Sequence, residues 1–346
     1  MHVVTDFLAD LEAESTDHEL RATIQRLNAQ LDKAKTNRAE LVDAVYRAAH
    51  DAAQGVTIPS VPVRATDRRR AKPEVAICLL ADWQTGKTTP SYNSDVAEER
   101  VARYGEKVVQ IIEMERQKHP VNEARIYLLG DLIEGEEIFP GQAHRIDASL
   151  YRQTFHTAEM LAKLVRQVKS CVPSVRVVGA IGNHGSMGGP VRRSYHPESN
   201  FDAMVYNVAR GYLKGEPGIE WDETFVAGER AWYATDDVLG KRWFLFHGDQ
   251  VKSASFGIPW YGFQKRLLGW ATSVEPFDYA ASGHWHVPVR EQVNAITHWG
   301  AGSTESSNTF AQEFLASGGQ RPSQWLLFQG TRGVTSEWCI QLDKET

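Results

Sequence analysis

The chain has 346 residues, of which 42% are hydrophobic and 24% charged, a composition typical of a globular protein with a sizeable core. Its 38 lysines and arginines are outnumbered by 44 aspartates and glutamates, and the net charge of -6 excludes a general attraction to nucleic acid or anionic lipid. Three widely separated cysteines favour reduced thiols over a disulfide framework or a thiolate metal site. Without a signal-peptide pattern or a bilayer-length apolar stretch, we expect a soluble, cytoplasmic protein with no membrane partner.

Residues 1–54 are predicted to form a helix with a coiled-coil period. Its apolar positions are spaced mainly by four and three residues: Leu20, Ile24, Leu27, Leu31, Ala34, Leu41, Val45 and Ala48. A single amphipathic helix packed on the main domain explains the same pattern, so a homo-oligomer is one of two interpretations. Residues 55–73 are predicted to be a linker, because Gly55, Pro59 and Pro62 precede a basic run at 68–72. Residues 74–346 are expected to form the main domain.

Within the main domain, short apolar runs predict buried strands and longer amphipathic runs predict helices. The expected strands are residues 75–81, 125–129, 175–181, 243–246 and 325–328, and the expected helices are 98–118 and 151–169. A strand, helix, strand order predicts an α/β fold with parallel pairing in its first half. Beyond residue 220 the strands come closer together, which predicts a second, more antiparallel sheet.

Each of the first four strands, and a further apolar segment, ends in polar residues that can bind metal. The five strand ends are Asp82-Trp83-Gln84, Gly130-Asp131, Gly182-Asn183-His184, His247-Gly248-Asp249 and Gly283-His284-Trp285-His286. Because ligands bind at the carboxyl ends of the strands in open α/β sheets, we expect these side chains to converge. Carboxylate and amide oxygens mixed with imidazoles, without thiolates, suit Mn, Fe, Zn or Mg rather than a structural zinc site.

In this order the motifs resemble the calcineurin-like metallophosphoesterases, whose pattern runs D-x-H, G-D, G-N-H-D/E, H and G-H-x-H. The match spans residues 75–289, and it implies a two-sheet sandwich flanked by helices. The segments 256–270 and 302–328 are similar to phage-encoded members near the nucleases of the Mre11 and SbcD type. The resemblance implies two divalent ions, with Mn favoured over Mg, Fe and Zn as the cofactor.

The resemblance also assigns roles to individual residues. One ion would be held by Asp82, Gln84, Asp131 and His286, and the other by Asp131, Asn183, His247 and His284. Asp131 would bridge the ions, which would activate a shared hydroxide, and His184 would protonate the leaving oxygen or hold the phosphoryl group. Two departures stand out: Gln84 replaces the first histidine, and Gly185 replaces the acid after His184, whose partner would then be Asp249 or Glu134.

Other candidate site residues each have a functional and a structural interpretation. Arg192 and Arg193, which follow a Gly-rich loop, could contact a substrate phosphate or simply be exposed to solvent. His144 and His196 could line the pocket or lie on the surface. The aromatic residues of the segment 256–270 could stack on single-stranded nucleic acid or be the buried face of an amphipathic helix. These residues are Phe256, Trp260, Tyr261, Phe263 and Trp270, interleaved with Lys252, Lys265 and Arg266.

These motifs predict a phosphodiesterase or nuclease that acts on DNA, RNA or nucleotides, and a nucleic acid or nucleotide is the expected partner. A phosphomonoesterase with the same metal centre is one alternative. Another is a non-catalytic binding or assembly module, in which Gln84 and Gly185 mark a decayed site.

Overall fold

The computed structural model describes residues 61–70, 72–139, 141–187, 199–222, 232–252, 259–308 and 321–343, together with the single positions 26 and 47. The chain forms two compact units, Met1–Asp51 and Ala52–Thr346. The helix expected over residues 1–54, and with it the coiled coil, lies outside the described residues apart from those two positions. That helix and the linker and domain boundaries therefore stay predictions.

The first sheet has six strands in the order β11-β10-β1-β2-β3-β4. β1 to β4 run parallel, and β10 and β11 add to the edge of β1 as antiparallel strands. The strands are β1 Glu74–Leu80, β2 Val121–Leu128, β3 Ser174–Gly179, β4 Ile219–Trp221, β10 Ser323–Gly330 and β11 Gly333–Gln341. Every residue of β1 is buried, because this central strand is covered on both faces, which explains its continuous apolar run.

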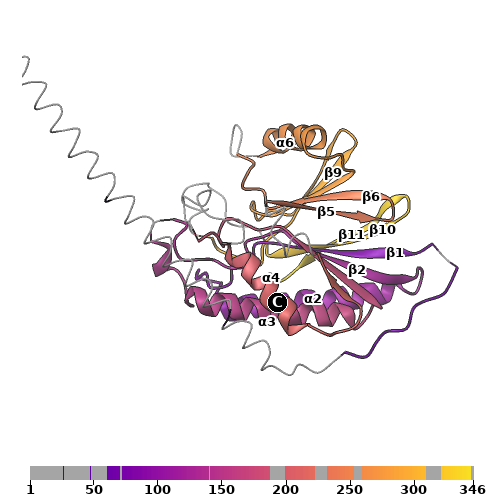
Figure 1. Ribbon diagram of the computed structural model, residues 1–346, viewed down its shortest axis with the longest axis horizontal. Helices are drawn as coiled ribbons and strands as arrows, with labels where there is room; N and C mark the ends of the chain where they lie inside the picture. The colour runs from indigo at the N-terminus through magenta and orange to yellow at the C-terminus, as the bar shows by residue number, and fades with distance from the viewer. Residues whose placement is uncertain are drawn as a thin grey trace, which may run out of the picture. The chain divides into compact units, whose positions relative to one another are not determined.

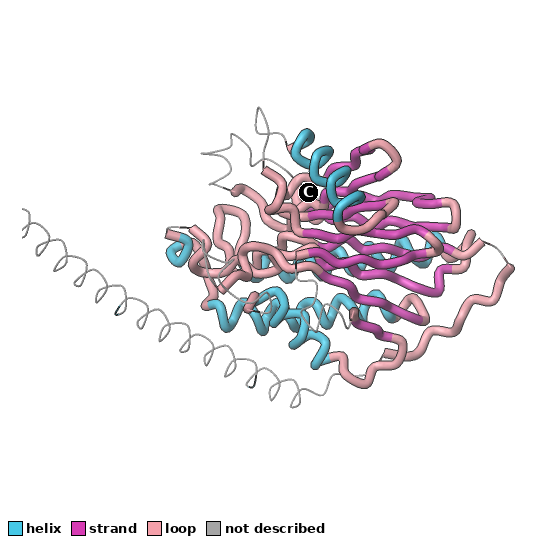
Figure 2. Tube along the Cα trace, turned by 45° about the horizontal axis from the view of Figure 1, so that its top comes forward, coloured by secondary structure: helices cyan, strands magenta, loops and turns pink. Residues whose placement is uncertain are grey.

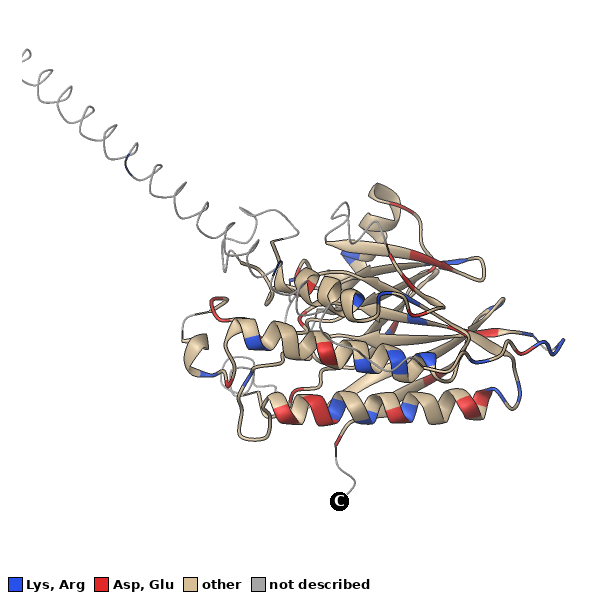
Figure 3. Ribbon diagram, turned by 60° about the horizontal axis from the view of Figure 1, so that its bottom comes forward, with Lys and Arg blue, Asp and Glu red and all other residues tan. Residues whose placement is uncertain are grey.

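Three helices connect the parallel strands and cover one face of the first sheet (Figure 1). They are α2 Ser94–Glu115, α3 Leu150–Lys169 and α4 Phe201–Tyr212, and a short 3-10 helix, η1 Gln142–His144, precedes α3. α2 begins where the Asn93 side chain accepts a hydrogen bond of 2.9 Å from the backbone N–H of Val96. Figure 3 shows charged residues along both long helices, acidic and basic ones mixed on α2 and mostly basic ones on α3, as expected for helices with one face toward solvent.

The second sheet has five strands in the order β5-β6-β7-β9-β8. They are β5 Tyr233–Val238, β6 Lys241–Phe246, β7 Tyr279–Ser282, β8 Val289–Val293 and β9 Ile296–Gly300. The pairs β5-β6 and β8-β9 are antiparallel hairpins, whereas β6-β7 and β7-β9 are parallel. The sheet is mixed, where the sequence suggested a more antiparallel one, because α6 Trp260–Ser273 carries the chain back between β6 and β7.

The two sheets pack face to face around an aromatic core. Figure 2 shows the strands with helices on either side of them. Trp243 of β6 lies at the centre of this core, 5.6 Å from the ring of Tyr127 and 5.2 Å from the ring of Trp299. α6 covers the outer face of the second sheet with Phe263, Leu267 and Trp270. The layers run helix, sheet, sheet, helix, which confirms the predicted α/β sandwich. None of the described helices combines the length and the apolar character needed to cross a membrane.

Candidate metal centre

The side chains predicted to bind metal follow the ends of five strands, and several of them meet. One residue comes from each strand: Asp82 after β1, Asp131 after β2, Asn183 after β3, His247 after β6 and His284 after β7. In the described part of the chain, one group of three acidic or imidazole side chains has ligand atoms all within 4.8 Å of one another. That group is Asp131, His247 and His284.

His247 Nε2 is the point on which these atoms converge. It lies 2.8 Å from Asp131 Oδ2, 3.1 Å from Asn183 Oδ1 and 3.2 Å from His284 Nδ1. Atoms bound at 2.0–2.2 Å to one ion must themselves lie roughly 3 Å apart, as these do. The His247 ring is fixed by its other nitrogen, Nδ1, which donates a hydrogen bond of 2.7 Å to the Leu129 carbonyl oxygen.

The residues present fit a divalent cation at this point. All four converging atoms, one carboxylate oxygen, one amide oxygen and two imidazole nitrogens, are suitable donors to Mn, Fe or Zn. Asp131 Oδ2 is buried without a well-formed hydrogen bond to any described residue, so it keeps lone pairs that only a cation or a proton can use. This group could therefore hold a metal ion.

The pKa values of the two imidazoles are pushed in opposite directions. Burial opposes a charged ring, yet the Asp131 carboxylate raises the pKa of His247 to about 10. Burial and the positive charge on His247 lower the pKa of His284 well below its ordinary value. This group of side chains thus attracts one positive charge, and a proton and a metal ion compete for it.

The backbone at five predicted ligands adopts a left-handed conformation. Their φ angles are 53° at Asp82, 44° at Gln84, 54° at Asp131, 71° at His284 and 56° at His286. Such angles are uncommon outside glycine, and residues held there with strain cost of order 1–3 kcal/mol each. These residues thus form the sharp turns that follow β1, β2 and β7.

Two glycines let the loops approach each other closely at this centre. A Cβ atom on Gly182 would lie 2.1 Å from Asp131 Oδ1, and one on Gly283 would lie 2.7 Å from Asp82 Oδ2. A side chain at either position would displace a predicted ligand. These two glycines therefore keep the backbone small beside the ligands.

Asp202, near the start of α4, ties two of these loops together, although no motif in the sequence points to it. Its Oδ2 accepts hydrogen bonds from the backbone N–H groups of Asp131 and Gly182, at 2.9 and 2.8 Å. Its Oδ1 accepts a third from the N–H of Leu132, at 3.0 Å. Because the side chain is fully buried, these three bonds fix the loops that carry Asp131 and Asn183.

His184 lies at the edge of the centre with its orientation fixed. Its Nδ1 donates a hydrogen bond of 2.7 Å to the Glu134 carbonyl oxygen and lies 3.3 Å from Glu134 Oε2. Glu134, one of the two candidate partners, therefore supplies the missing acid. Burial opposes charge on His184, but Asp131 and Glu134 raise its pKa to about 9. Glycine fits at position 185, where an acid would be expected, because a Cβ atom there would lie 2.4 Å from Oδ1 of Asn200, the N-cap of α4.

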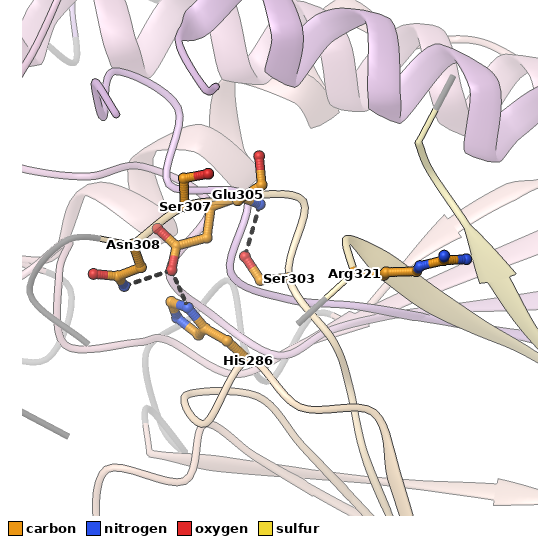
Figure 4. Close-up of a pocket in the computed structure, with 7 residues that line it drawn as sticks. His286, Ser303, Glu305, Ser307, Asn308 and Arg321 are labelled. Carbon is orange, nitrogen blue, oxygen red and sulfur yellow. Dashed lines mark hydrogen bonds and ion pairs between the residues drawn. The ribbon is translucent and has the colours of Figure 1, made fainter. Parts of the chain in front are cut away.

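The remaining predicted ligands, Gln84 and His286, lie in a different network. Gln84 Nε2 is 3.2 Å from His286 Nε2, and Gln84 Oε1 accepts a hydrogen bond of 2.7 Å from Lys87 Nζ. His286 Nδ1 is 2.5 Å from Glu305 Oε1, and its Nε2 is 3.4 Å from Asp82 Oδ1. Figure 4 shows Glu305 between His286, Asn308 and Ser303. Lys87 and Glu305 were not singled out from the sequence.

The softer candidates have mixed outcomes. Arg192, Arg193, His196 and Phe256 lie outside the described residues, and His144 is exposed at the end of η1. In α6, Phe263 and Trp270 are buried in the core under the helix, as the amphipathic-helix alternative predicts, whereas Trp260 and Tyr261 are 43% and 71% exposed.

The helix-flanked pair of sheets, with the candidate ligands at strand ends in the order of the motif series, has the architecture that the resemblance to the calcineurin-like metallophosphoesterases implies. A scan against protein-family models and a search of curated proteins found no match. Solved structures similar to this chain include a novel archaeal phosphodiesterase, with 10% identity, coverage of 77% of this chain and 99% of that one, and a TM-score of 0.36.

Two further structures have 14% identity and cover 78% of this chain. Vacuolar protein sorting 29 from Cryptosporidium parvum is covered over 93% of its length, with a TM-score of 0.38. A predicted phosphoesterase from Streptococcus pneumoniae is covered over 100% of its length, with a TM-score of 0.31. At these TM-scores the likenesses carry no argument about activity or substrate, and the narrower resemblance to phage-encoded nucleases stays a prediction.

Proposed function

We propose that this protein is a metal-dependent phosphoesterase. The observation that carries the proposal is the convergence of Asp131, Asn183 and His284 on His247 Nε2 at 2.8 to 3.2 Å. A divalent ion held there would offset the negative charge of a phosphoryl group and make water more acidic. The order of the motifs along the chain supports phosphoester hydrolysis as the reaction.

His184 supplies the proton in this proposal. Its Nδ1 is engaged by Glu134, so Nε2 is the ring nitrogen that faces the centre, 4.0 Å from Asp131 Oδ2, and in the imidazolium form it carries a proton that it can donate. The side chain is 13% exposed, which leaves it accessible to a substrate. The leaving oxygen takes this proton as the ester bond breaks, and His184 is left neutral.

A phosphodiester of a nucleic acid or nucleotide is the substrate class that we favour. The exposed Trp260 and Tyr261 begin α6 and lie beside exposed Lys265 and Arg266 on the same helix, a combination that suits stacking on bases and contact with phosphates. The start of α6 packs on the loop that follows His247, because a Cβ on Gly262 would lie 2.7 Å from the Lys252 carbonyl oxygen. A substrate bound at the start of α6 would thus lie near the loop that follows the proposed metal ligand His247.

The test compares bis-p-nitrophenyl phosphate, p-nitrophenyl phosphate and defined DNA and RNA strands, each with added Mn, Mg, Fe or Zn. We expect metal-dependent turnover of the diesters, reduced about a hundredfold or more in His247→Ala. Asn183→Ala provides a second variant outside the buried core. His156→Ala, which changes a partly exposed histidine on α3, is the matched control and should keep full activity.

Three other results are informative. Preference for the monoester would favour a phosphatase. Binding of metal without hydrolysis of any substrate would favour a non-catalytic module. Metal-dependent turnover that survives in a folded His247→Ala protein would refute the proposed centre.

A further inference from the structure

A lysine ammonium group lies in the half of the centre where the sequence places the first metal ion. Lys87 is three residues beyond Gln84 in the loop after β1. Its Nζ forms a close ion pair with Glu305 Oε2 and donates a hydrogen bond of 2.7 Å to Gln84 Oε1. The side chain is 12% exposed, so this positive charge belongs to the interior of the site and not to the solvated surface.

The Lys87 ammonium also determines which way the Gln84 amide points. With Oε1 toward Lys87, the Gln84 NH2 group faces His286 Nε2 at 3.2 Å. The opposite orientation would place the NH2 group against the ammonium, so that two donors would face each other. The amide oxygen, which is the atom that Gln84 would offer to an ion, is therefore already used.

Glu305 is built to hold Lys87 in this place. Its Oε1 accepts hydrogen bonds from His286 Nδ1 at 2.5 Å and from Asn308 Nδ2 at 2.7 Å, while its backbone N–H donates to Ser303 Oγ at 2.9 Å. Figure 4 shows these groups around the carboxylate. Because Glu305 is only 5% exposed, its charge needs a buried partner, and Lys87 provides one.

The other expected ligands of the first ion leave few free atoms. Asp82 Oδ2 accepts a hydrogen bond of 2.8 Å from the backbone N–H of His284, which leaves Oδ1, a buried atom without a well-formed hydrogen bond to any described residue. Among the described residues, Asp82 and His286 do not form a group of three ligands with atoms within 4.8 Å, unlike Asp131, His247 and His284. The residues present thus fit one ion well and do not fit the predicted set for the other.

We propose that the protein binds one divalent ion per chain, at Asp131, Asn183, His247 and His284, and that the Lys87 ammonium supplies the positive charge that a second ion would bring beside Asp82. This inference rests on the proposed metal centre and departs from the two-ion arrangement expected from the sequence. An ammonium can donate hydrogen bonds and offset charge, but it has no empty orbital with which to bind water. The residues of this half therefore contribute electrostatics alone.

The test counts metal ions per chain and does not depend on activity. The full-length protein is loaded with Mn, freed of excess by equilibrium dialysis, and assayed for metal by mass spectrometry and for spin-coupled Mn pairs by electron paramagnetic resonance. We expect one ion per chain and no coupled pair in wild type and in Lys87→Arg. In Lys87→Met and Lys87→Gln the ammonium is lost and the Gln84 oxygen is released, so we expect a second ion and a coupled signal.

The matched control is Lys163→Met, which removes an exposed lysine paired with Glu98 and Glu159 and should leave the count at one. Two ions in wild type would overturn the inference, and this result stands even if neither neutral variant folds. One ion in both folded neutral variants would overturn the role of Lys87. No ion in wild type would instead overturn the proposed function itself, so the two failures are distinguishable.

Discussion

Replacing Asp202 by asparagine tests whether one buried carboxylate holds the metal-binding loops together. The substitution keeps the size of the side chain but removes its charge and one of its two acceptor oxygens. The remaining oxygen can accept from Asp131 and Gly182, which both donate to the same atom in wild type. The new NH2 group then faces the N–H of Leu132, which loses its acceptor.

The expected loss can be worked from these three bonds. An unsatisfied buried N–H costs about 1–3 kcal/mol, and two bonds that change from a charged to a neutral acceptor lose about 1 kcal/mol each. The removal of a buried negative charge offsets part of this, because burial and the Asp131 charge raise the pKa of Asp202 to about 6. The net destabilisation should be about 2–4 kcal/mol, and ion affinity should fall because Asp131 and Asn183 are no longer held in place.

Urea unfolding and calorimetric titration with Mn would measure both effects. Asp237→Asn makes the same chemical change in an exposed ion pair with Arg242, and it should cost less than about 1 kcal/mol and leave Mn binding unchanged. If Asp202→Asn loses no more stability than this control and binds Mn as tightly as wild type, the carboxylate does not tie the loops together.

Three further predictions follow from other features. Gly182→Ala would place a Cβ atom 2.1 Å from Asp131 Oδ1, so we expect a folded protein with Mn affinity at least about tenfold weaker by calorimetry; unchanged affinity would contradict the close packing. Burial raises the pKa of Cys78 and Cys171 from 9.0 to about 12, so the folded chain keeps these thiols protonated, and their stabilising contribution is complete below pH 9 and lost as pH rises from 9 toward 12. Each thiol should lower the free energy of unfolding by about 1.4 kcal/mol at pH 10 relative to pH 8, measured by urea unfolding in reductant. Cys78→Ala should lose about half as much between these pH values as wild type, and an equal loss in both proteins would contradict the raised pKa of Cys78. Removal of residues 1–54 should lower the mass seen by light scattering without changing the metal content, and an unchanged mass would reject assembly through this segment.

The strand-end rule was sufficient to find the ligands that converge on His247. It works because buried parallel strands are marked by apolar runs, and their carboxyl ends meet whatever the details of the loops. Glu305 obeys the same rule, since it follows β9, but the run Ile-Thr-His-Trp-Gly is short and contains two polar residues, so it does not stand out as a strand. His298 in this strand is buried, and its ring nitrogens form hydrogen bonds with Ser282 and Glu291. Hydropathy alone does not predict that such a polar residue is buried.

Lys87 and Asp202 could not be predicted for a different reason. A lysine in a loop is usually solvated, and only the folded position of Glu305, more than two hundred residues later in the chain, turns Lys87 into an interior charge. An aspartate in the first turn of a helix is explained by the helix dipole, so its bonds to two distant loops leave no trace in the sequence. Gln84 illustrates the same limit, because its position was predicted but the orientation of its amide depends on Lys87.

At the left-handed turns that follow the strands, backbone stability and ion binding favour different residues. Glycine adopts such φ angles without a steric penalty, so the backbone at Asp82, Asp131 and His284 would be more relaxed with glycine there. A chain under selection for thermal stability alone would gain by drifting to glycine at these turns and would lose its ion-binding groups in the process. At these turns the groups that could bind an ion therefore occupy positions where glycine would leave the backbone less strained.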